Sequence, residues 1–300
     1  MGAANVIPGV SGGTIALITG VFEKLIHSLK SIDHIALAYL FKGKLRAFSS
    51  YINLPFLFAI FSGALLSVFS LARILSWLFN HYPVYIWAYF FGLILASVYF
   101  VGKTINRWTF SVITLMAVGI FLAAWISFLR PAEGNENILY LMLCGAAAVS
   151  SMILPGLSGS FILILMGNYE LVAIEAINEF RLDILIPVFT GIVLGLLVFS
   201  HFLSWIFKNF RYHTLALLTG FIAGSLVILW PWKYPVYRTD DLGVVISKPD
   251  GTFIIQNYVR YIPDSFSTEV ISAILFIFAG IFSIWLIEKI AVKYKVNKQF

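Results

Sequence analysis

The sequence predicts an all-α integral membrane protein built from two inverted-topology repeats, each with one re-entrant broken-helix hairpin and three transmembrane helices. Three observations lead to this fold class. The composition is 60% hydrophobic and only 11% charged, whereas soluble domains carry roughly 25% charged residues. Apolar stretches of membrane length recur along the chain, and a Pro-Gly-x-Ser-Gly motif occurs twice. The basic residues lie between apolar stretches, which suits the positive-inside rule and argues against a nucleic-acid partner.

The spans are expected where about twenty residues are predominantly apolar, because a helix of that length crosses the hydrocarbon core of the bilayer. Two further apolar stretches, 3–27 and 138–172, are each interrupted by the Pro-Gly motif, so we interpret them as re-entrant hairpins. Residues 28–50 mix apolar residues with Lys and Arg and are expected to form an interfacial amphipathic segment. The stretches that qualify as spans are 54–79, 84–101, 111–129, 184–207, 213–230 and 267–288.

Residues 231–266 are polar and contain several prolines, unlike the apolar stretches on either side. Within them, VVIS at 244–247 and TFIIQ at 252–256 are separated by KPDG. Short runs rich in β-branched residues around a Pro-Asp-Gly turn are typical of a hairpin. We therefore expect a small extracytoplasmic β-hairpin in 231–266.

An internal repeat is the strongest pattern in the chain. Residues 8–23 read PGVSGGTIALITGVFE and residues 155–170 read PGLSGSFILILMGNYE, which match at an offset of 147. A second block matches without gaps at an offset of 128. Chance similarity between apolar segments would share Leu and Ile rather than Pro, Gly, Ser, Trp and Glu at one register. The predicted repeats are 1–133 and 134–300.

The distribution of charge orients the two repeats. Lys and Arg gather in the segments expected to be cytoplasmic, which are 28–50, 102–110, 208–212 and the C-terminus. The segments expected outside are 130–137, 173–183 and 231–266. The charges alternate correctly only if the two Pro-Gly segments do not cross the bilayer. Each repeat then has an odd number of spans and the second is inverted, as in many secondary transporters. We expect a multi-pass protein of the inner or plasma membrane with both termini in the cytoplasm.

The two Pro-Gly breaks are the expected binding site. Proline stops a helix and glycine allows a tight turn, so the serine that follows can cap a new helix. Free N–H groups at a helix N-terminus bind anions with the help of the helix dipole. A single break is more often a structural kink, but two breaks of opposite orientation would face one central anion site. The residues expected to line it are Ser11, Gly12, Gly13, Thr14, Ser158, Gly159 and Ser160.

Two ionisable residues, Arg73 and His201, fall inside predicted spans at matching positions of the repeat. Intramembrane ionisable residues mark functional sites by default, although a long side chain near a helix end can instead reach the headgroups. Arg73 can bind a phosphate or carboxylate through two parallel hydrogen bonds. Asn5, just before the first break, can orient a ligand through its amide group. We expect all three to contribute to substrate binding.

Glu23 and Glu170, at matching positions, are expected to end the two half-helices. A carboxylate at a helix C-terminus opposes the dipole, so a bound proton or a basic partner must compensate it. We interpret both as candidate proton-coupling residues. The alternative is a hydrated carboxylate at the membrane surface.

The paired motifs NVIPGVSGGTIALITGVFE and ILPGLSGSFILILMGNYE resemble the twin signatures of the bacterial polyprenyl-phosphate (undecaprenyl-phosphate) transporter family, also called PopT-type. The resemblance covers almost the whole chain. It implies a flippase that returns undecaprenyl phosphate, the lipid carrier of cell-wall polymer synthesis, to the cytoplasmic leaflet. The residues alone indicate only an anion site at the centre of an inverted repeat. The apolar run before the second break begins at Ile138, so its counterpart would start about ten residues before Met1, and we expect part of the first half-helix to be missing.

Two other function classes stay open on the sequence. A transporter or channel for a small inorganic anion would use the same anion site without a cleft open to the bilayer. An enzyme such as a lipid phosphatase would need a nucleophile or base, commonly His with basic phosphate ligands. The five His residues are scattered without catalytic spacing. We therefore expect no enzymatic activity, no catalytic residues, no cofactor and no metal site.

Overall fold

Apolar helices form most of the protein, which the computed structural model describes over residues 11–129, 131–237 and 255–296. Helices suit this composition because they satisfy their own backbone hydrogen bonds in lipid. In chain order they are α2 (Gly12–Ile18), α3 (Phe22–Lys30), α4 (His34–Phe41), α5 (Leu45–Tyr51), α6 (Leu54–His81), α7 (Pro83–Gly102), α8 (Phe110–Ile126), α9 (Ile138–Ile153), α10 (Gly159–Leu165), the π-helix η1 (Leu171–Glu175), α11 (Ala176–Asn178), α12 (Leu182–Asn209), α13 (Arg211–Leu229) and α14 (Thr268–Val296). The strands are β1 (Lys233–Tyr237) and β2 (Ile255–Arg260).

Each of the six predicted spans coincides with one long helix: α6, α7, α8, α12, α13 or α14. Within the described residues, four helices are long and apolar enough to cross a membrane: α7, α12, α13 and α14. A fifth span results if α5 and the first part of α6, which are bent by 68° relative to each other, are counted together. Helix α8 is also apolar, but with 17 residues it is shorter than these four helices.

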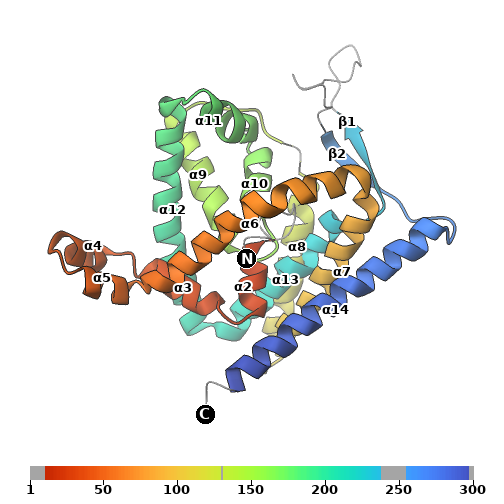
Figure 1. Ribbon diagram of the computed structural model, residues 1–300, viewed down its shortest axis with the longest axis horizontal. Helices are drawn as coiled ribbons and strands as arrows, with labels where there is room; N and C mark the ends of the chain where they lie inside the picture. Colours follow the sequence, from red (N-terminus) through yellow and green to blue (C-terminus); the bar gives the residue numbers. More distant parts are fainter. Residues whose placement is uncertain (1–10, 130, 238–254, 297–300) are drawn as a thin grey trace.

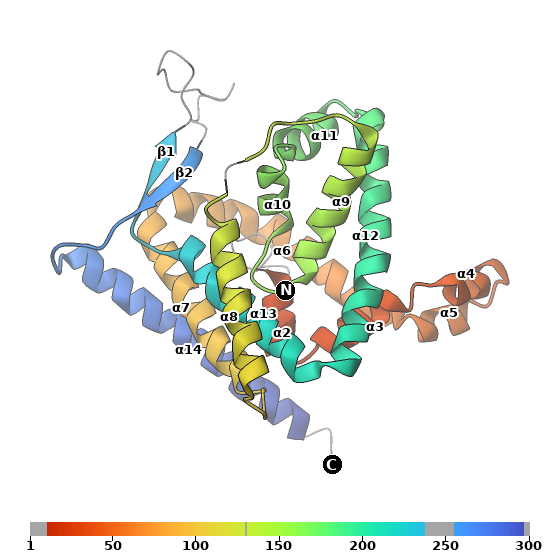
Figure 2. The same ribbon diagram turned by 180° about the vertical axis from the view of Figure 1, so that it is seen from behind.

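The short helices α2 and α10 lie between two groups of long helices (Figure 1). One group contains α9 packed on α12, and the other contains α7, α8, α13 and α14. The opposite view shows the same central position of α2 and α10 (Figure 2). Ala16 on α2 and Leu157 beside α10 belong to one buried apolar cluster with Leu218 on α13. Residues of both broken segments therefore contribute to the core between the two groups of helices.

Helix bounds recur at the offset of 128 found in the sequence. Helix α12 begins and ends 128 residues after α6, and α13 begins 128 residues after α7. The residues that join these helices, Tyr82 and Phe210, adopt almost the same backbone angles, with φ −136° and ψ 50° in one and φ −135° and ψ 49° in the other. Matching sequence blocks thus have matching local structure.

The second helix of each predicted repeat packs on the third helix of the other repeat. Gly92 on α7 lies so close to the carbonyl of Ile277 on α14 that a Cβ atom would overlap it, and Gly220 on α13 approaches Met116 on α8 in the same way. Glycine is required at these two positions because the helix backbones nearly touch. The two interfaces are thus built alike, and each joins residues from both halves of the chain.

A small two-stranded sheet forms within 231–266, as predicted, and it includes a strand at 233–237 that the sequence did not suggest. Strands β1 and β2 form a two-stranded antiparallel sheet. The predicted strand 244–247 lies outside the described residues, and the predicted strand 252–256 overlaps β2 only at its start. The sequence analysis missed β1 because it contains Pro235, which argues against a central strand but is tolerated in a strand at a sheet edge.

Residues 28–50 are helical and project from the side of the protein as the end of α3, α4 and α5 (Figure 1). The carboxylate of Asp33 caps α4 by accepting hydrogen bonds from the N–H groups of Ile35 and Ala36, at 2.9 and 3.0 Å. Phe41 is 85% exposed. The interfacial position of this segment stays a prediction.

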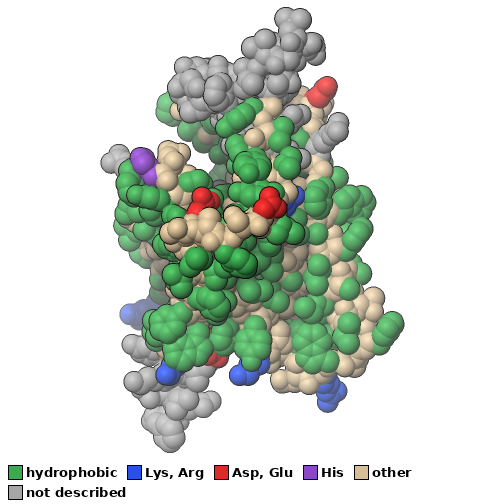
Figure 3. Space-filling view, turned by 90° about the vertical axis from the view of Figure 1, so that its right-hand side faces the viewer, with side chains coloured by type: hydrophobic (Ala, Val, Ile, Leu, Met, Phe, Trp, Pro, Cys, Tyr) green, Lys and Arg blue, Asp and Glu red, His purple; other side chains and the backbone are tan. Residues whose placement is uncertain are grey.

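The outer surface is largely apolar. On the side that carries α14, hydrophobic side chains cover most of the visible face, and the Lys and Arg side chains lie mainly along its lower edge (Figure 3). Exposed large residues of α14 include Leu275, Phe278 and Phe282. A continuous apolar surface of this kind suits contact with lipid rather than water.

Candidate functional site

The first break is buried against the second. Ser11 is the N-cap of α2, and its hydroxyl oxygen accepts a hydrogen bond from the N–H of Gly13 at 3.0 Å. The same hydroxyl donates toward the carbonyl oxygens of Leu154 at 3.0 Å and Met152 at 3.3 Å. Ser11 is 2% exposed. This serine therefore caps its own helix and also ties the first break to the end of α9.

Gly13 and Thr14 extend this contact. The hydroxyl of Thr14, which is fully buried, accepts a hydrogen bond from the N–H of Gly156 at 3.2 Å. A Cβ atom at Gly13 would lie 2.5 Å from the carbonyl oxygen of Ile153. The structure thus gives Gly13 a packing role, because it lets the two breaks approach each other through their backbones.

The second break has a more open environment. Ser158 is the N-cap of α10 and accepts a hydrogen bond from the N–H of Phe161 at 3.2 Å. Its hydroxyl lies 3.4 Å from the hydroxyl of Ser160. Ser158 is half-buried and Ser160 is exposed, whereas Gly159 is buried against the Ala148 carbonyl of α9. The two hydroxyl groups are therefore the part of this break that a ligand can reach.

The described backbone has nearly the same conformation at matching positions at the start and the end of both half-helices. The N-cap residues Ser11 and Ser158 have φ −107° and −114°, with ψ 141° and 143°. The half-helices end at Gly20 and Gly167, with φ 71° and 73°, a left-handed conformation that favours glycine. In each case the N–H of the next residue bonds to a carbonyl five residues back, as in a Schellman motif.

The half-helices are shorter than predicted, and the expected positions of Glu23 and Glu170 are wrong. Helix α2 ends at Ile18 and α10 at Leu165, because the chain turns at the glycines that follow. Glu23 lies in the first turn of the next helix, α3, and Glu170 lies directly before η1. A carboxylate is favoured by the dipole at a helix start, so the expected conflict with the dipole does not arise.

Glu23 has a basic partner. Its Oε1 lies 2.8 Å from Nη2 of Arg211, the first residue of α13. Both side chains are more than half exposed, at 52% and 62%. The ion pair links the end of the first broken segment to the second half of the chain. A proton-coupling role for Glu23 or Glu170 stays a prediction.

The other candidates are not joined to the breaks. Asn5 lies outside the described residues, and so does the side chain of Arg73, whose backbone lies in α6. His201 on α12 is exposed, and its Nδ1 lies 2.8 Å from the carbonyl oxygen of Leu197, one turn earlier. That contact stays within α12, so among the described residues His201 does not reach either break.

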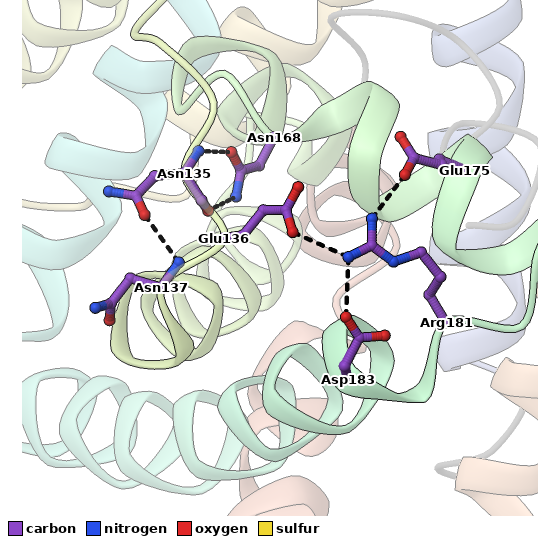
Figure 4. Close-up of polar contacts among 7 residues, drawn as sticks. All are labelled: Asn135, Glu136, Asn137, Asn168, Glu175, Arg181 and Asp183. Carbon is purple, nitrogen blue, oxygen red and sulfur yellow. Dashed lines mark hydrogen bonds and ion pairs between the residues drawn. The ribbon is translucent and has the colours of Figure 1, made fainter.

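Asn168, which was not among the residues predicted from the sequence, fastens the end of α10. Its side-chain oxygen accepts a hydrogen bond from the N–H of Asn135 at 2.8 Å, and its amide nitrogen donates to the Asn135 carbonyl at 2.7 Å (Figure 4). Asn168 is fully buried. The available signal was a polar residue where the first repeat has Val21.

Arg181 holds the same region together from the start of α12. Its guanidinium bonds to Glu136 at 2.9 Å, Glu175 at 2.7 Å and Asp183 at 2.9 Å (Figure 4). These carboxylates come from the segment before α9, from η1 and from α12. The second broken segment is therefore tied at its outer end, while its hydroxyl pair stays open. Over the described part of the chain, His, Cys, Asp and Glu side chains form no cluster of three or more that could hold a metal ion.

These features define a class: a multi-pass α-helical membrane protein in which the starts of two short helices, α2 and α10, are joined by contacts between two groups of long helices. The chain matches the family model described as undecaprenyl phosphate translocase-like over residues 1–244, and it belongs to this family. The paired motifs therefore identified the family correctly.

Two curated relatives support this assignment. The chain is 43% identical over 233 residues to a polyprenyl-phosphate transporter of Vibrio cholerae serotype O1, which covers 78% of this chain and 75% of that protein. It is 29% identical over 248 residues to a polyprenyl-phosphate transporter of Staphylococcus aureus, covering 77% and 83%. The family and both relatives are named for transport and not for catalysis. No solved structure matches the chain significantly.

Proposed function

We propose that this protein carries polyprenyl phosphate, with undecaprenyl phosphate as the expected substrate, from the outer to the cytoplasmic leaflet for cell-envelope polymer synthesis. The names of the relatives support the substrate class. The apolar outer surface supports a substrate that enters from the bilayer. The charge distribution supports an inner or plasma membrane location with both termini in the cytoplasm.

The proposed phosphate site is the hydroxyl pair of the second break. Ser158 and Ser160 donate to the phosphate oxygens at the start of α10, and Gly159 lets this start pack on α9. Ser11, Gly12, Gly13 and Thr14 form the buried base of the site. The observation that carries the proposal is the direct contact between the two breaks, with hydroxyl groups on the side that stays open.

Phosphate needs more positive charge than the breaks supply. A phosphate monoester carries −1.5 to −2 charges at pH 7, whereas a helix N-terminus supplies about half a positive charge. Arg73 on α6 is the proposed source of the remaining charge, with His201 and Asn5 as secondary contributors. Replacing Arg73 with Lys should weaken lipid-phosphate binding, and replacing it with Ala should weaken it further, because only Arg offers a planar fork.

The proposed mechanism is alternating access between two inverted repeats. The matching helix bounds, the equivalent glycine contacts and the matching backbone angles of Ser11 and Ser158 support two interchangeable halves. If the halves exchange conformations, Ser11 becomes accessible when Ser158 and Ser160 become buried. A cysteine at position 160 should then react with a thiol reagent from one side of the membrane, and a cysteine at position 11 only from the other.

The apolar surface also offers space for an isoprenoid tail. A hollow of about 500 Å³ lies between η1, α11 and α12, lined by apolar residues that include Val172, Ile177, Leu185 and Phe189. It lies beside the segment that follows the second break. An isoprenoid tail needs apolar space near the phosphate site, whereas a small inorganic anion does not, so the hollow is consistent with a lipid substrate.

The decisive experiment is transfer of a short-chain prenyl phosphate across reconstituted vesicles. We expect the wild-type protein to transfer it, and the double variant Ser158→Ala/Ser160→Ala to lose most of this activity while remaining folded. Ser150→Ala is the matched control, because among the described residues the Ser150 hydroxyl donates only to the Ala146 carbonyl within α9. Full transfer by the double variant would move the phosphate site elsewhere. Strong competition by inorganic phosphate would favour the small-anion alternative.

A further inference from the structure

Two cations meet at the C-terminal end of α13. Lys233 and Arg260 lie opposite each other in the two-stranded sheet. The ammonium group of Lys233 donates a hydrogen bond to the Ile228 carbonyl at 2.5 Å, and Nε of Arg260 donates to the Val227 carbonyl at 2.7 Å. Both cations are thus held against the last turn of one helix.

Aromatic rings surround this pair. The Lys233 Nζ lies 3.4 Å from the ring centroid of Trp87 and 4.9 Å from that of Tyr258, and the Arg260 guanidinium lies 5.0 Å from the ring of Phe128. Burial, followed by the nearby charge of Arg260, lowers the pKa of Lys233 to about 7. Burial also lowers the pKa of Arg260. The pair is therefore partly removed from water although both groups carry the same sign.

Both side chains cap the C-terminal end of α13, but this capping role uses only part of their positive charge. Capping the C-terminus of α13 compensates about half a unit of negative charge, whereas the pair brings two positive charges when Lys233 is protonated. Among the described residues, the ion pairs involve Arg181 and Arg211, and neither Lys233 nor Arg260 contacts a carboxylate. Two like charges in a half-buried position repel each other, which favours loss of the Lys233 proton, and a bound anion would instead favour the protonated form.

We propose that Lys233 and Arg260 form a second anion site, which takes the phosphate monoester of the substrate before or after it occupies the break. This inference rests on the proposed function. Arg260 uses Nε for the helix cap, which leaves its two terminal nitrogens for a bidentate phosphate contact. The aromatic rings provide an apolar wall beside the headgroup.

Helix α13 connects the two proposed sites. Gly156 of the second break lies against the middle of α13. A Cβ atom at this position would lie only 2.6 Å from the carbonyl oxygen of Phe221. From Phe221 to Ile228 the helix rises by about 10 Å. The cation pair therefore lies about two turns beyond the break, toward the side that the charge distribution places outside the cytoplasm. A headgroup arriving from the outer leaflet would meet it first.

The test is protection of Lys233 from an amine-reactive acylating reagent, followed by mass spectrometry of the purified full chain in detergent. A short-chain prenyl phosphate should slow acylation of Lys233 about tenfold, the effect of a charge-assisted hydrogen bond, and the corresponding prenol should not. Lys289, which stacks on Trp285 at 4.7 Å, is the internal control and should react equally in every sample. The variant Arg260→Gln, which keeps a donor for the Val227 carbonyl, should lose the protection. Equal acylation of Lys233 with and without prenyl phosphate would overturn the inference.

Inorganic phosphate distinguishes the two sources of the same anion. Protection by prenyl phosphate alone assigns the site to the lipid headgroup, and equal protection by inorganic phosphate at the same concentration overturns that assignment in favour of free phosphate. Failure of this inference is separable from failure of the proposed function. If Lys233 is not protected but the protein still transfers prenyl phosphate, only the second site is refuted. If the wild-type protein transfers no prenyl phosphate, the proposed function is refuted.

Discussion

The serines that cap the two half-helices have the same backbone conformation but opposite environments. Ser11 is buried and bonded to carbonyls of α9, whereas Ser158 is half-buried beside the exposed Ser160. The start of α2 packs against the backbone of the second break and is buried by it. Equal motifs therefore do not have equal access to a ligand, because access depends on which segment packs over each motif.

The paired helices α6 and α12 show the same contrast. Gly191 on α12 lies against the carbonyl of Met142 on α9, so closely that a Cβ would overlap it. Its counterpart Gly63 on α6 has no atom within 4 Å of such a Cβ among the described residues. Matching helices thus carry matching small residues, but only α12 uses them to receive a neighbouring helix.

The largest expected effect comes from adding a side chain where the two breaks touch. Gly13→Val places a branched side chain where even a Cβ would lie 2.5 Å from the Ile153 carbonyl. Overpacking of this kind costs about 1–3 kcal/mol or more, so thermal unfolding in detergent should shift strongly downward. Gly63→Ala is the control and should be neutral or slightly stabilising. Similar stability of both variants would mean that the two breaks do not touch.

A smaller effect is expected for the two capping serines, and it should differ in kind. Ser11→Ala leaves the Gly13 N–H without its cap inside the protein, which costs about 1–3 kcal/mol. Ser158→Ala removes a cap that is half exposed, which costs about 1 kcal/mol of stability. For the same loss of stability, however, it should reduce transfer of prenyl phosphate more strongly than Ser11→Ala does. Unfolding and transfer measured on the same preparations would sharpen the comparison. The opposite order in transfer would show that the first break binds the headgroup.

The smallest effect is expected at Glu23. Its ion pair with Arg211 is more than half exposed at both ends, and such pairs contribute about 0–1 kcal/mol. Glu23→Gln should therefore lower stability by less than about 1 kcal/mol. Its effect on transfer at several pH values tests the proton-coupling hypothesis, with Glu170→Gln as the counterpart in the second repeat. A pH profile unchanged in both variants would leave Glu23 as a structural partner of Arg211.

Much of the fold follows from the sequence. The positions of the long helices depend on runs of apolar residues, and the matching ends of α6 and α12 follow from the offset of 128. The sites of the breaks depend on Pro, Gly and Ser, whose backbone preferences act within a few residues. The family is visible because its motifs are contiguous. The half-helices were predicted too long, because Gly20 and Gly167 were treated as helical residues when each ends a helix.

What only the tertiary structure decided concerns contacts between segments far apart in the chain. Ser11 bonds to Leu154 across 143 residues, and Lys233 meets Arg260 because two strands pair beside the end of α13. Neither contact has a local sequence signal. The buried Ser11 and the more open Ser158, for example, lie in the same Pro-Gly-x-Ser-Gly motif. Composition and periodicity determine which segments are helical and apolar, but the burial of a particular hydroxyl or cation depends on the backbone that packs against it.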